Sequence, residues 1–134
     1  MTLSRREASD LLSSHGLAPS RALGQNFVVD ANTVRKIASQ AGVGVGDHVV
    51  EIGAGLGSLT RALLETGAKV LAIEVDRGLI PILRELEANH RGQLTVVEVD
   101  ATKADWNVLL AASDSWKLIA NLPYNVATPL VADI

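Results

Sequence analysis

Short apolar runs alternate with helical patterns over most of the chain. Runs rich in β-branched and aliphatic residues, which are typical of strands, cover residues 48–52, 69–75, 94–99 and 118–120. Between these runs, apolar residues recur at helical spacing over residues 58–66, 77–90 and 106–112. Because strands and helices alternate, we expect an α/β fold with a parallel sheet.

The first 42 residues follow a different pattern. A capping-box sequence at residues 4–7 begins a short helix that ends before Gly16. Asp30 is a suitable N-cap for a second helix, which ends at Gly42. We therefore divide the chain into an N-terminal helical segment, residues 1–42, and a sheet-containing core, residues 43–134.

The end of the chain carries a further helical pattern over residues 126–134, after Pro123. With that assignment the sheet has only four strands, which leaves one of its edges uncovered. We therefore expect the sequence to be the front part of a longer protein.

Composition limits the class of protein. Of the 134 residues, 48% are apolar and 20% are charged, so the chain can form a core and is not intrinsically disordered. The net charge is −3, and there is no Cys, which excludes disulfides, thiolate metal sites and thiol nucleophiles. No apolar run approaches the roughly 20 residues of a membrane helix, and no signal-peptide pattern is present. We expect a cytoplasmic protein.

A glycine-rich run lies between the first predicted strand and the helix after it. Residues 51–57 read Glu-Ile-Gly-Ala-Gly-Leu-Gly, and glycine allows both a tight turn and close approach of a ligand to the backbone. The spacing differs from the dinucleotide fingerprint G-x-G-x-x-G, because Ser58 stands where its last glycine would be. An NAD-dependent oxidoreductase is therefore disfavoured, and the sequence contains no Walker A motif.

Acidic residues stand at or beside the ends of three consecutive predicted strands. They are Glu51, Glu74 and Asp100. For each one alone, a helix cap or a solvated turn is the better explanation. However, the carboxyl ends of parallel strands meet at one edge of an open sheet, where a carboxylate can accept hydrogen bonds from both hydroxyls of a ribose. Together the three acids favour a nucleoside-binding site.

The fourth predicted strand is followed by Asn121, Leu122, Pro123 and Tyr124. In isolation this sequence is an ordinary turn. The exocyclic amine of adenine is a poor nucleophile, and two acceptors on its hydrogens, Asn121 Oδ1 and the Leu122 carbonyl, would help to make it pyramidal. Tyr124 can stack on the base, while Pro123 stiffens the loop. The combination indicates chemistry on an adenine amino group.

With these motifs in this order, the chain resembles the rRNA adenine N6-dimethyltransferase family, and within it the small-subunit type. The resemblance rests on residues 23–28 (Leu-Gly-Gln-Asn-Phe-Val), residues 51–57, Glu74, the pair at 100–101, and residues 121–124. It implies the Rossmann-like fold of class I methyltransferases, which use S-adenosylmethionine as the methyl donor. This chain would hold that fold up to its fourth strand, without the C-terminal helical domain of the family.

The resemblance also implies roles for individual residues. Glu74 would hold the ribose of S-adenosylmethionine, and Asp100 would accept a hydrogen bond from the adenine amino group of the cofactor. The implied cofactor residues are Gln25, Asn26, Val28, Glu51, Gly53, Gly55, Gly57, Glu74, Asp100, Ala101 and Asn121. The implied catalytic residues are Asn121, Leu122, Pro123 and Tyr124. We expect no metal site, because His15, His48 and His90 share no ligand spacing.

The implied activity is the transfer of methyl groups from S-adenosylmethionine to N6 of two adjacent adenines, with S-adenosylhomocysteine as the product. The adenines lie in a hairpin loop near the 3′ end of 16S rRNA. We expect a monomer that binds the immature small ribosomal subunit and is weakly active or inactive without the rest of the family's fold. Two alternatives stay open: an antibiotic-resistance enzyme that methylates large-subunit rRNA, and a non-catalytic ribosome-binding scaffold.

Overall fold

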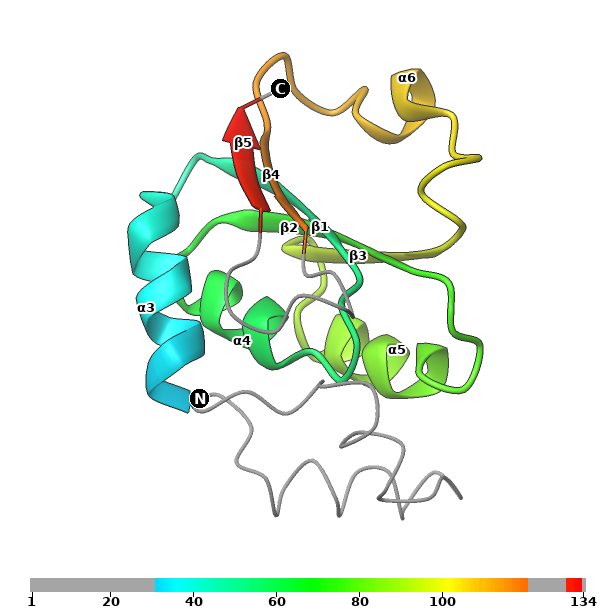
Figure 1. Ribbon diagram of the computed structural model, residues 1–134, viewed down its shortest axis with the longest axis horizontal. Coiled ribbons are helices and arrows are strands. Elements are labelled where there is room, and N and C mark those ends of the chain that lie inside the picture. Colours follow the sequence, from blue (N-terminus) through cyan, green and yellow to red (C-terminus); the bar gives the residue numbers. More distant parts are fainter. Residues whose placement is uncertain (1–30, 121–129, 134) are drawn as a thin grey trace.

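A mixed sheet forms the centre of the protein. The structure is a computed structural model that describes residues 31–120 and 130–133. The strands stand in the order β3-β2-β1-β4-β5 (Figure 1). Neighbouring strands among the first four are parallel, whereas β5 pairs antiparallel with β4. The strands are β1 (His48–Ile52), β2 (Lys69–Glu74), β3 (Leu94–Glu98), β4 (Lys117–Ala120) and β5 (Leu130–Asp133).

Helices cover the two faces of the sheet unequally. The described helices are α3 (Ala31–Ala41), α4 (Ser58–Glu65), α5 (Ile80–Asn89) and α6 (Trp106–Leu109). The first three lie on one face of the sheet, and the short α6 lies over the other (Figure 1). Within the part of the chain that the structure describes, no helix has the length and apolar character needed to cross a membrane.

The predicted alternation of strands and helices is confirmed. Each of the four predicted strands is present, with bounds that differ from the prediction by at most one residue. The helix predicted over 77–90 spans only Ile80–Asn89, and Pro81 lies in its first turn, where its missing N–H costs no helical hydrogen bond. The helix predicted over 106–112 is only 4 residues long.

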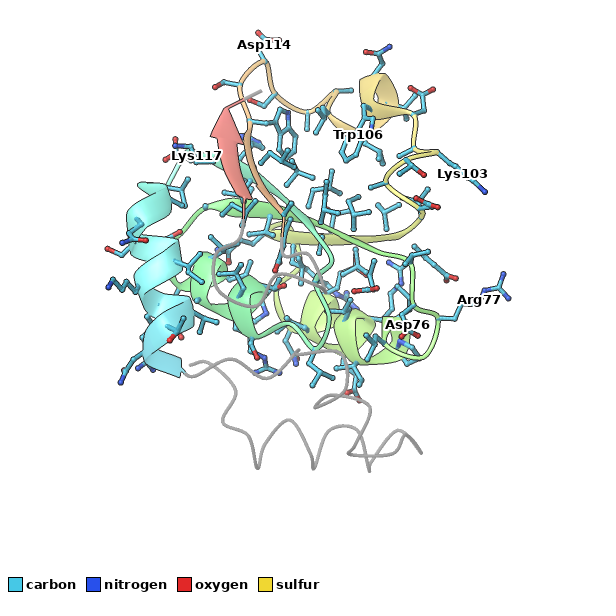
Figure 2. The ribbon with its side chains drawn as sticks, in the orientation of Figure 1. Asp76, Arg77, Lys103, Trp106, Asp114 and Lys117 are labelled. Carbon is cyan, nitrogen blue, oxygen red and sulfur yellow. The ribbon has the colours of Figure 1, made fainter. Side chains whose placement is uncertain are left out.

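Alternate strand residues contact two separate apolar clusters. On one face, Val49 and Ile119 pack with the inward sides of α3, α4 and α5. On the other face, Val50 and Trp116 pack with Trp106, which Figure 2 shows on the side of α6 that faces the sheet. Because both faces are covered, the strands read as nearly continuous apolar runs instead of alternating ones.

The C-terminal segment departs from the sequence-based expectation. Residues 130–133, predicted as part of a helix over 126–134, form β5, in which Leu130 pairs with Ala120. The helix prediction is therefore wrong for these residues, and the sheet has a fifth strand beyond the four expected. The outer edge of β4 offers a row of backbone groups that need partners. The sequence Leu-Val-Ala-Asp suits a strand as well as a helix, so pairing with that edge decides its conformation.

The strand order places a topological switch next to β1. From β1 the chain moves outward through β2 to β3, and it then returns to the other side of β1 as β4. Ligands of open α/β sheets bind outside the carboxyl ends of the strands at such a switch. The glycine-rich residues 53–57 follow β1 directly, so the fold places them at this position.

Candidate functional site

The glycine-rich loop turns sharply as it leaves β1. Gly53, Gly55 and Gly57 have φ angles of +79°, +60° and +88°, which residues with a side chain rarely adopt. The Gly53 N–H donates to the carbonyl of Ile73 on β2 at 2.9 Å, and the Gly57 N–H donates to the carbonyl of Ala54 at 2.9 Å. The three glycines are therefore required by the loop's own conformation, whatever the loop binds.

Gly57 also lets the loop pack closely against α5. A Cβ at this position would lie 3.1 Å from Leu86 Cδ2 and 3.4 Å from Leu83 Cδ2. Gly57 begins α4 as its N-cap, and its carbonyl accepts from the Arg61 N–H at 2.8 Å. The absence of a side chain at the third glycine of the motif thus allows the start of α4 to lie close to α5.

Glu74, the last residue of β2, ties the glycine loop to the neighbouring strand. Its side chain is buried, and its Oε1 accepts from the Gly55 N–H at 2.7 Å. Its Oε2 accepts from the N–H groups of Val75 and Asp76 at 3.0 and 2.9 Å. Three backbone donors hold this carboxylate in one orientation, and a carboxylate offers about four acceptor positions. Acceptor capacity therefore remains for one further donor.

Glu51 occupies a different environment, within β1. Its side chain is 0% exposed, and its Oε1 accepts from the Thr60 hydroxyl on α4. Burial raises the pKa of Glu51 to about 8, the Thr60 hydrogen bond opposes that rise, and the negative charge of Glu74 adds to it. Its Oε2 has no hydrogen-bond partner among the described residues. Glu51 is therefore mainly a neutral acid at pH 7, unlike an exposed carboxylate.

Asp100 and Ala101 lie just beyond the end of β3. The Val99 N–H donates to the Glu74 carbonyl at 3.1 Å, so the ends of β2 and β3 lie side by side. Asp100 Oδ1 accepts from the backbone N–H and the hydroxyl of Thr102, at 2.9 and 2.7 Å. These bonds lower the pKa of Asp100. Its side chain thus closes a local turn, which agrees with the solvated-turn interpretation of this acid.

The backbone carbonyl of Ala101 is also engaged. It accepts from Trp106 Nε1 at 3.2 Å, and Trp106 packs against the apolar cluster beneath α6. The segment after β3 is therefore attached to the sheet through an aromatic side chain. That attachment helps to hold the segment with Asp100 and Ala101 at the carboxyl edge of the sheet.

The remaining predicted site residues fall outside the described ranges 31–120 and 130–133, so their positions in the site stay predictions. They are Gln25, Asn26, Val28, Asn121, Leu122, Pro123 and Tyr124. Across the residues that are described, no group of three His, Asp or Glu side chains is arranged to hold a metal ion.

Sequence reasoning did not identify two hydroxyl residues that organise the acids. Thr60 holds Glu51, and Thr102 holds Asp100. Thr102 could have been found, because an Asp followed two residues later by Thr is a common local turn signal. Thr60 could not, since its partner lies on another element and only the packing of α4 on β1 brings the two together.

Comparison with known proteins gives consistent matches. The sequence profile described as "Ribosomal RNA adenine dimethylase" matches residues 18–134. The chain is 47% identical over 125 residues to the ribosomal RNA small subunit methyltransferase A of Agrobacterium fabrum, covering 92% of this chain and 45% of that protein. It is 50% identical over 122 residues to the protein of the same name from Phenylobacterium zucineum, with coverages of 91% and 42%. The chain therefore spans less than half the length of these curated relatives.

Solved structures share the fold. The 23S rRNA methyltransferase ErmE aligns with a TM-score of 0.53 and 23% identity, over 72% of this chain and 48% of that chain. A dimethyladenosine transferase from Plasmodium falciparum aligns with a TM-score of 0.50 and 24% identity, over 66% of this chain and 41% of that chain. At these identities the likeness concerns the fold alone, and it confirms the predicted Rossmann-like methyltransferase fold.

Proposed function

Because this chain belongs to the ribosomal RNA adenine dimethylase family, we propose that it forms the cofactor-binding part of a 16S rRNA adenine dimethyltransferase. The enzyme would transfer methyl groups from S-adenosylmethionine to N6 of two adjacent adenines in a hairpin loop near the 3′ end of 16S rRNA. The names of the relatives, small subunit methyltransferase A, support a small-subunit substrate. We expect the protein to act as a monomer on immature small subunits in the cytoplasm.

The described residues fit S-adenosylmethionine by their chemistry. Glu74 presents a fixed, negatively charged acceptor at the carboxyl end of β2, with capacity for one further donor such as a ribose hydroxyl. Gly53 and Gly55 have no side chain, so the cofactor's methionine end can approach the backbone closely. Asp100, on the next strand end, would accept from the adenine amino group. The bound cofactor supplies a methyl group activated by its sulfonium charge.

For the chemical step, we assign roles to the residues that match the family's catalytic motif. Asn121 Oδ1 and the Leu122 carbonyl would accept the two hydrogens of the target amine, which localises its lone pair toward the methyl group. Tyr124 would stack on the target adenine, and Pro123 would stiffen the loop that carries all three groups. Gln25, Asn26 and Val28 would border the methionine end of the cofactor.

One observation carries the proposal: the hydrogen bond between Glu74 and the Gly55 N–H at the topological switch point. It joins an acidic strand end to the glycine loop at the position where ligands of such sheets bind. A carboxylate that three backbone donors hold would lose little side-chain entropy on binding.

Calorimetric titration of S-adenosylhomocysteine into this chain tests the proposal. We expect saturable one-site binding, weakened about tenfold or more in Glu74→Gln, because hydrogen bonds to a charged acceptor contribute about 1.5–3 kcal/mol. Glu98→Gln is the matched control, since Glu98 pairs with Glu74 in the register of β2 and β3 and also ends its strand. The control should bind within about twofold of the unsubstituted chain. A chain that is folded by circular dichroism and does not bind would contradict the proposal.

A methyl-transfer assay then tests the substrate. Unmethylated small and large ribosomal subunits would each be incubated with labelled S-adenosylmethionine and with this chain or a full-length relative. We expect little transfer by this chain, which spans less than half of its relatives, and transfer to adenine N6 by the relative. Label on large-subunit rRNA in place of 16S rRNA would contradict the assigned substrate.

A further inference from the structure

Among the described strands, β3 lies at one edge of the sheet and pairs with β2 alone. The carbonyl of Gln93 accepts from the Val70 N–H at 2.8 Å, and the Val99 N–H donates to the Glu74 carbonyl at 3.1 Å. Odd-numbered residues of this segment therefore bond toward β2, and the backbone groups of even-numbered residues face outward. An open edge of this kind is a template for pairing with another strand.

Two side chains of α5 occupy the outward-facing groups of Val96. Glu87 Oε2 accepts from the Val96 N–H at 2.6 Å, and Arg84 donates from Nη1 to the Val96 carbonyl at 2.7 Å. The two side chains also bond each other, with 3.0 Å between Arg84 Nη1 and Glu87 Oε1. They therefore present one acceptor and one donor to a single residue, as a neighbouring strand would.

The preceding outward-facing N–H on this edge is also occupied. The Leu94 N–H donates to the carbonyl of His90, at the end of α5, at 2.9 Å. In this way α5 and the turn after it cover the edge from Leu94 to Val96. Both partners of Val96 are charged, and charge-assisted hydrogen bonds are roughly twice as strong as neutral ones. An incoming strand would have to displace them before it could pair.

We propose that Arg84 and Glu87 form an edge cap, which keeps the β3 strand of a second copy of this chain from pairing with β3. The sequence of β3, Leu-Thr-Val-Val-Glu, is rich in β-branched residues and therefore suited to such pairing. Two copies of one edge strand can pair antiparallel about a twofold axis, so the competing partner is the chain itself. The cap is independent of the glycine loop and of the methyl-transfer proposal.

Sedimentation velocity over a concentration series tests the edge cap. The test variant is the double substitution Arg84→Ala with Glu87→Ala. The control is Arg77→Ala with Glu98→Ala, which removes an ion pair of 3.3 Å on the same strand. Figure 2 shows Arg77 extending outward from the loop before α5, and among the described residues this pair has no hydrogen bond to the β3 backbone. Both variants keep the net charge at −3.

We expect the Arg84/Glu87 variant to self-associate about tenfold or more tightly than the control variant. Two results would overturn the proposal. Both folded variants could stay monomeric over the whole concentration series, or both could associate equally, which would mean that association follows from loss of charge and not from an uncovered edge.

Hydrogen exchange at the Val96 amide is a second test, which does not depend on association. In the unsubstituted chain this amide should exchange about as slowly as the amides inside the sheet, although it faces outward. Glu87→Gln keeps an acceptor oxygen and should retain most of the protection, whereas Glu87→Ala should speed exchange about tenfold or more. Exchange of Val96 as fast as that of an exposed loop amide in the unsubstituted chain would overturn the proposal.

Discussion

The carboxyl ends of β2 and β3 lie side by side, but their acids are held in different ways. Glu74 is buried and accepts from three backbone N–H groups, one of which belongs to the glycine loop. Asp100 is partly exposed, and among the described residues its carboxylate accepts from Thr102 alone, two residues later in its own turn. One acid therefore connects two elements of the fold, and the other stabilises a local turn.

This difference indicates how the two acids would take part in binding. Three backbone donors hold the Glu74 carboxylate in place, so the proposed binding of a ribose would cost little side-chain entropy there. Asp100 can rotate once its local bonds are broken, which makes it the adaptable member of the pair. Variants of Glu51, of the glycine loop and of the two strand-end acids show how firmly each part of this edge is held.

The largest effect is expected from Glu51→Gln in the pH dependence of stability. The pKa of Glu51 in the folded chain, about 8, lies above its ordinary value of 4.5. The folded state holds the proton more tightly, so this stability is fully present below about pH 4.5 and is lost as pH rises toward 8. The loss is on the order of 5 kcal/mol, at about 1.4 kcal/mol per pKa unit.

Urea unfolding at a series of pH values measures this effect. Gln stays neutral, so the Glu51→Gln variant should lack the decline between pH 4.5 and 8. An equal decline in the variant and in the unsubstituted chain would show that Glu51 is not the group responsible.

The second prediction concerns how tightly the glycine loop is packed. Gly57→Ala should destabilise the fold by about 2–3 kcal/mol, because the new Cβ combines a positive φ with a contact of 3.1 Å to Leu86. Gly92→Ala is the matched control, since Gly92 has a φ of +84° and nothing within 4 Å of the added Cβ. The control should lose only about 1–2 kcal/mol in thermal or chemical unfolding. Equal losses would mean that α5 yields to the added methyl group.

The third prediction compares the two acids directly. Glu74→Ala should lower the free energy of unfolding by about 1–3 kcal/mol, because the buried Gly55 N–H and the partly buried Asp76 N–H lose their acceptor. Asp100→Ala should have a clearly smaller effect, since water can replace its bonds to Thr102. Chemical unfolding of the two variants at pH 7 measures the difference. If Asp100→Ala lowers the free energy of unfolding as much as Glu74→Ala does, the two strand-end acids are held equally firmly and the contrast is wrong.

The smallest effect is expected from Thr102→Val. Thr102 lowers the pKa of Asp100, so removing its hydroxyl should raise that pKa toward the ordinary value. The sign of the linked stability follows: the contribution of Asp100 is present above its ordinary pKa and is lost as pH falls through the lowered one. Titration of the Asp100 carboxyl carbon by NMR measures the shift. An unchanged pKa would show that the Thr102 hydroxyl does not hold this carboxylate.

Much of the fold could be predicted from local pattern. The strands and helices between residues 48 and 120 follow from periodicity, and the placement of Glu74 beside Gly55 follows from the rule that parallel strands share a carboxyl edge. The position of Pro81 in the first turn of α5 follows from the fixed φ of proline.

Other features depend on contacts between distant residues, which a local pattern does not contain. Residues 130–133 form a strand because the edge of β4 is next to them, not because of their own preference. Two further contacts arise only when helices pack on strands. One is the hydrogen bond from Thr60 to Glu51. The other is the pair of bonds that Arg84 and Glu87 make to the backbone of Val96. Such pairings require the assembled fold to be known.

Chemical-shift mapping of S-adenosylhomocysteine on the isotope-labelled chain tests the central claim most directly, because it reports where the ligand binds. If the carboxyl edge around Glu74 is the cofactor site, the amides of Gly53, Gly55, Val75 and Asp76 should shift most, and the amide of Val96 should not move. Binding that leaves those four amides unchanged, or that shifts residues at the opposite end of the strands such as His48, would contradict the account.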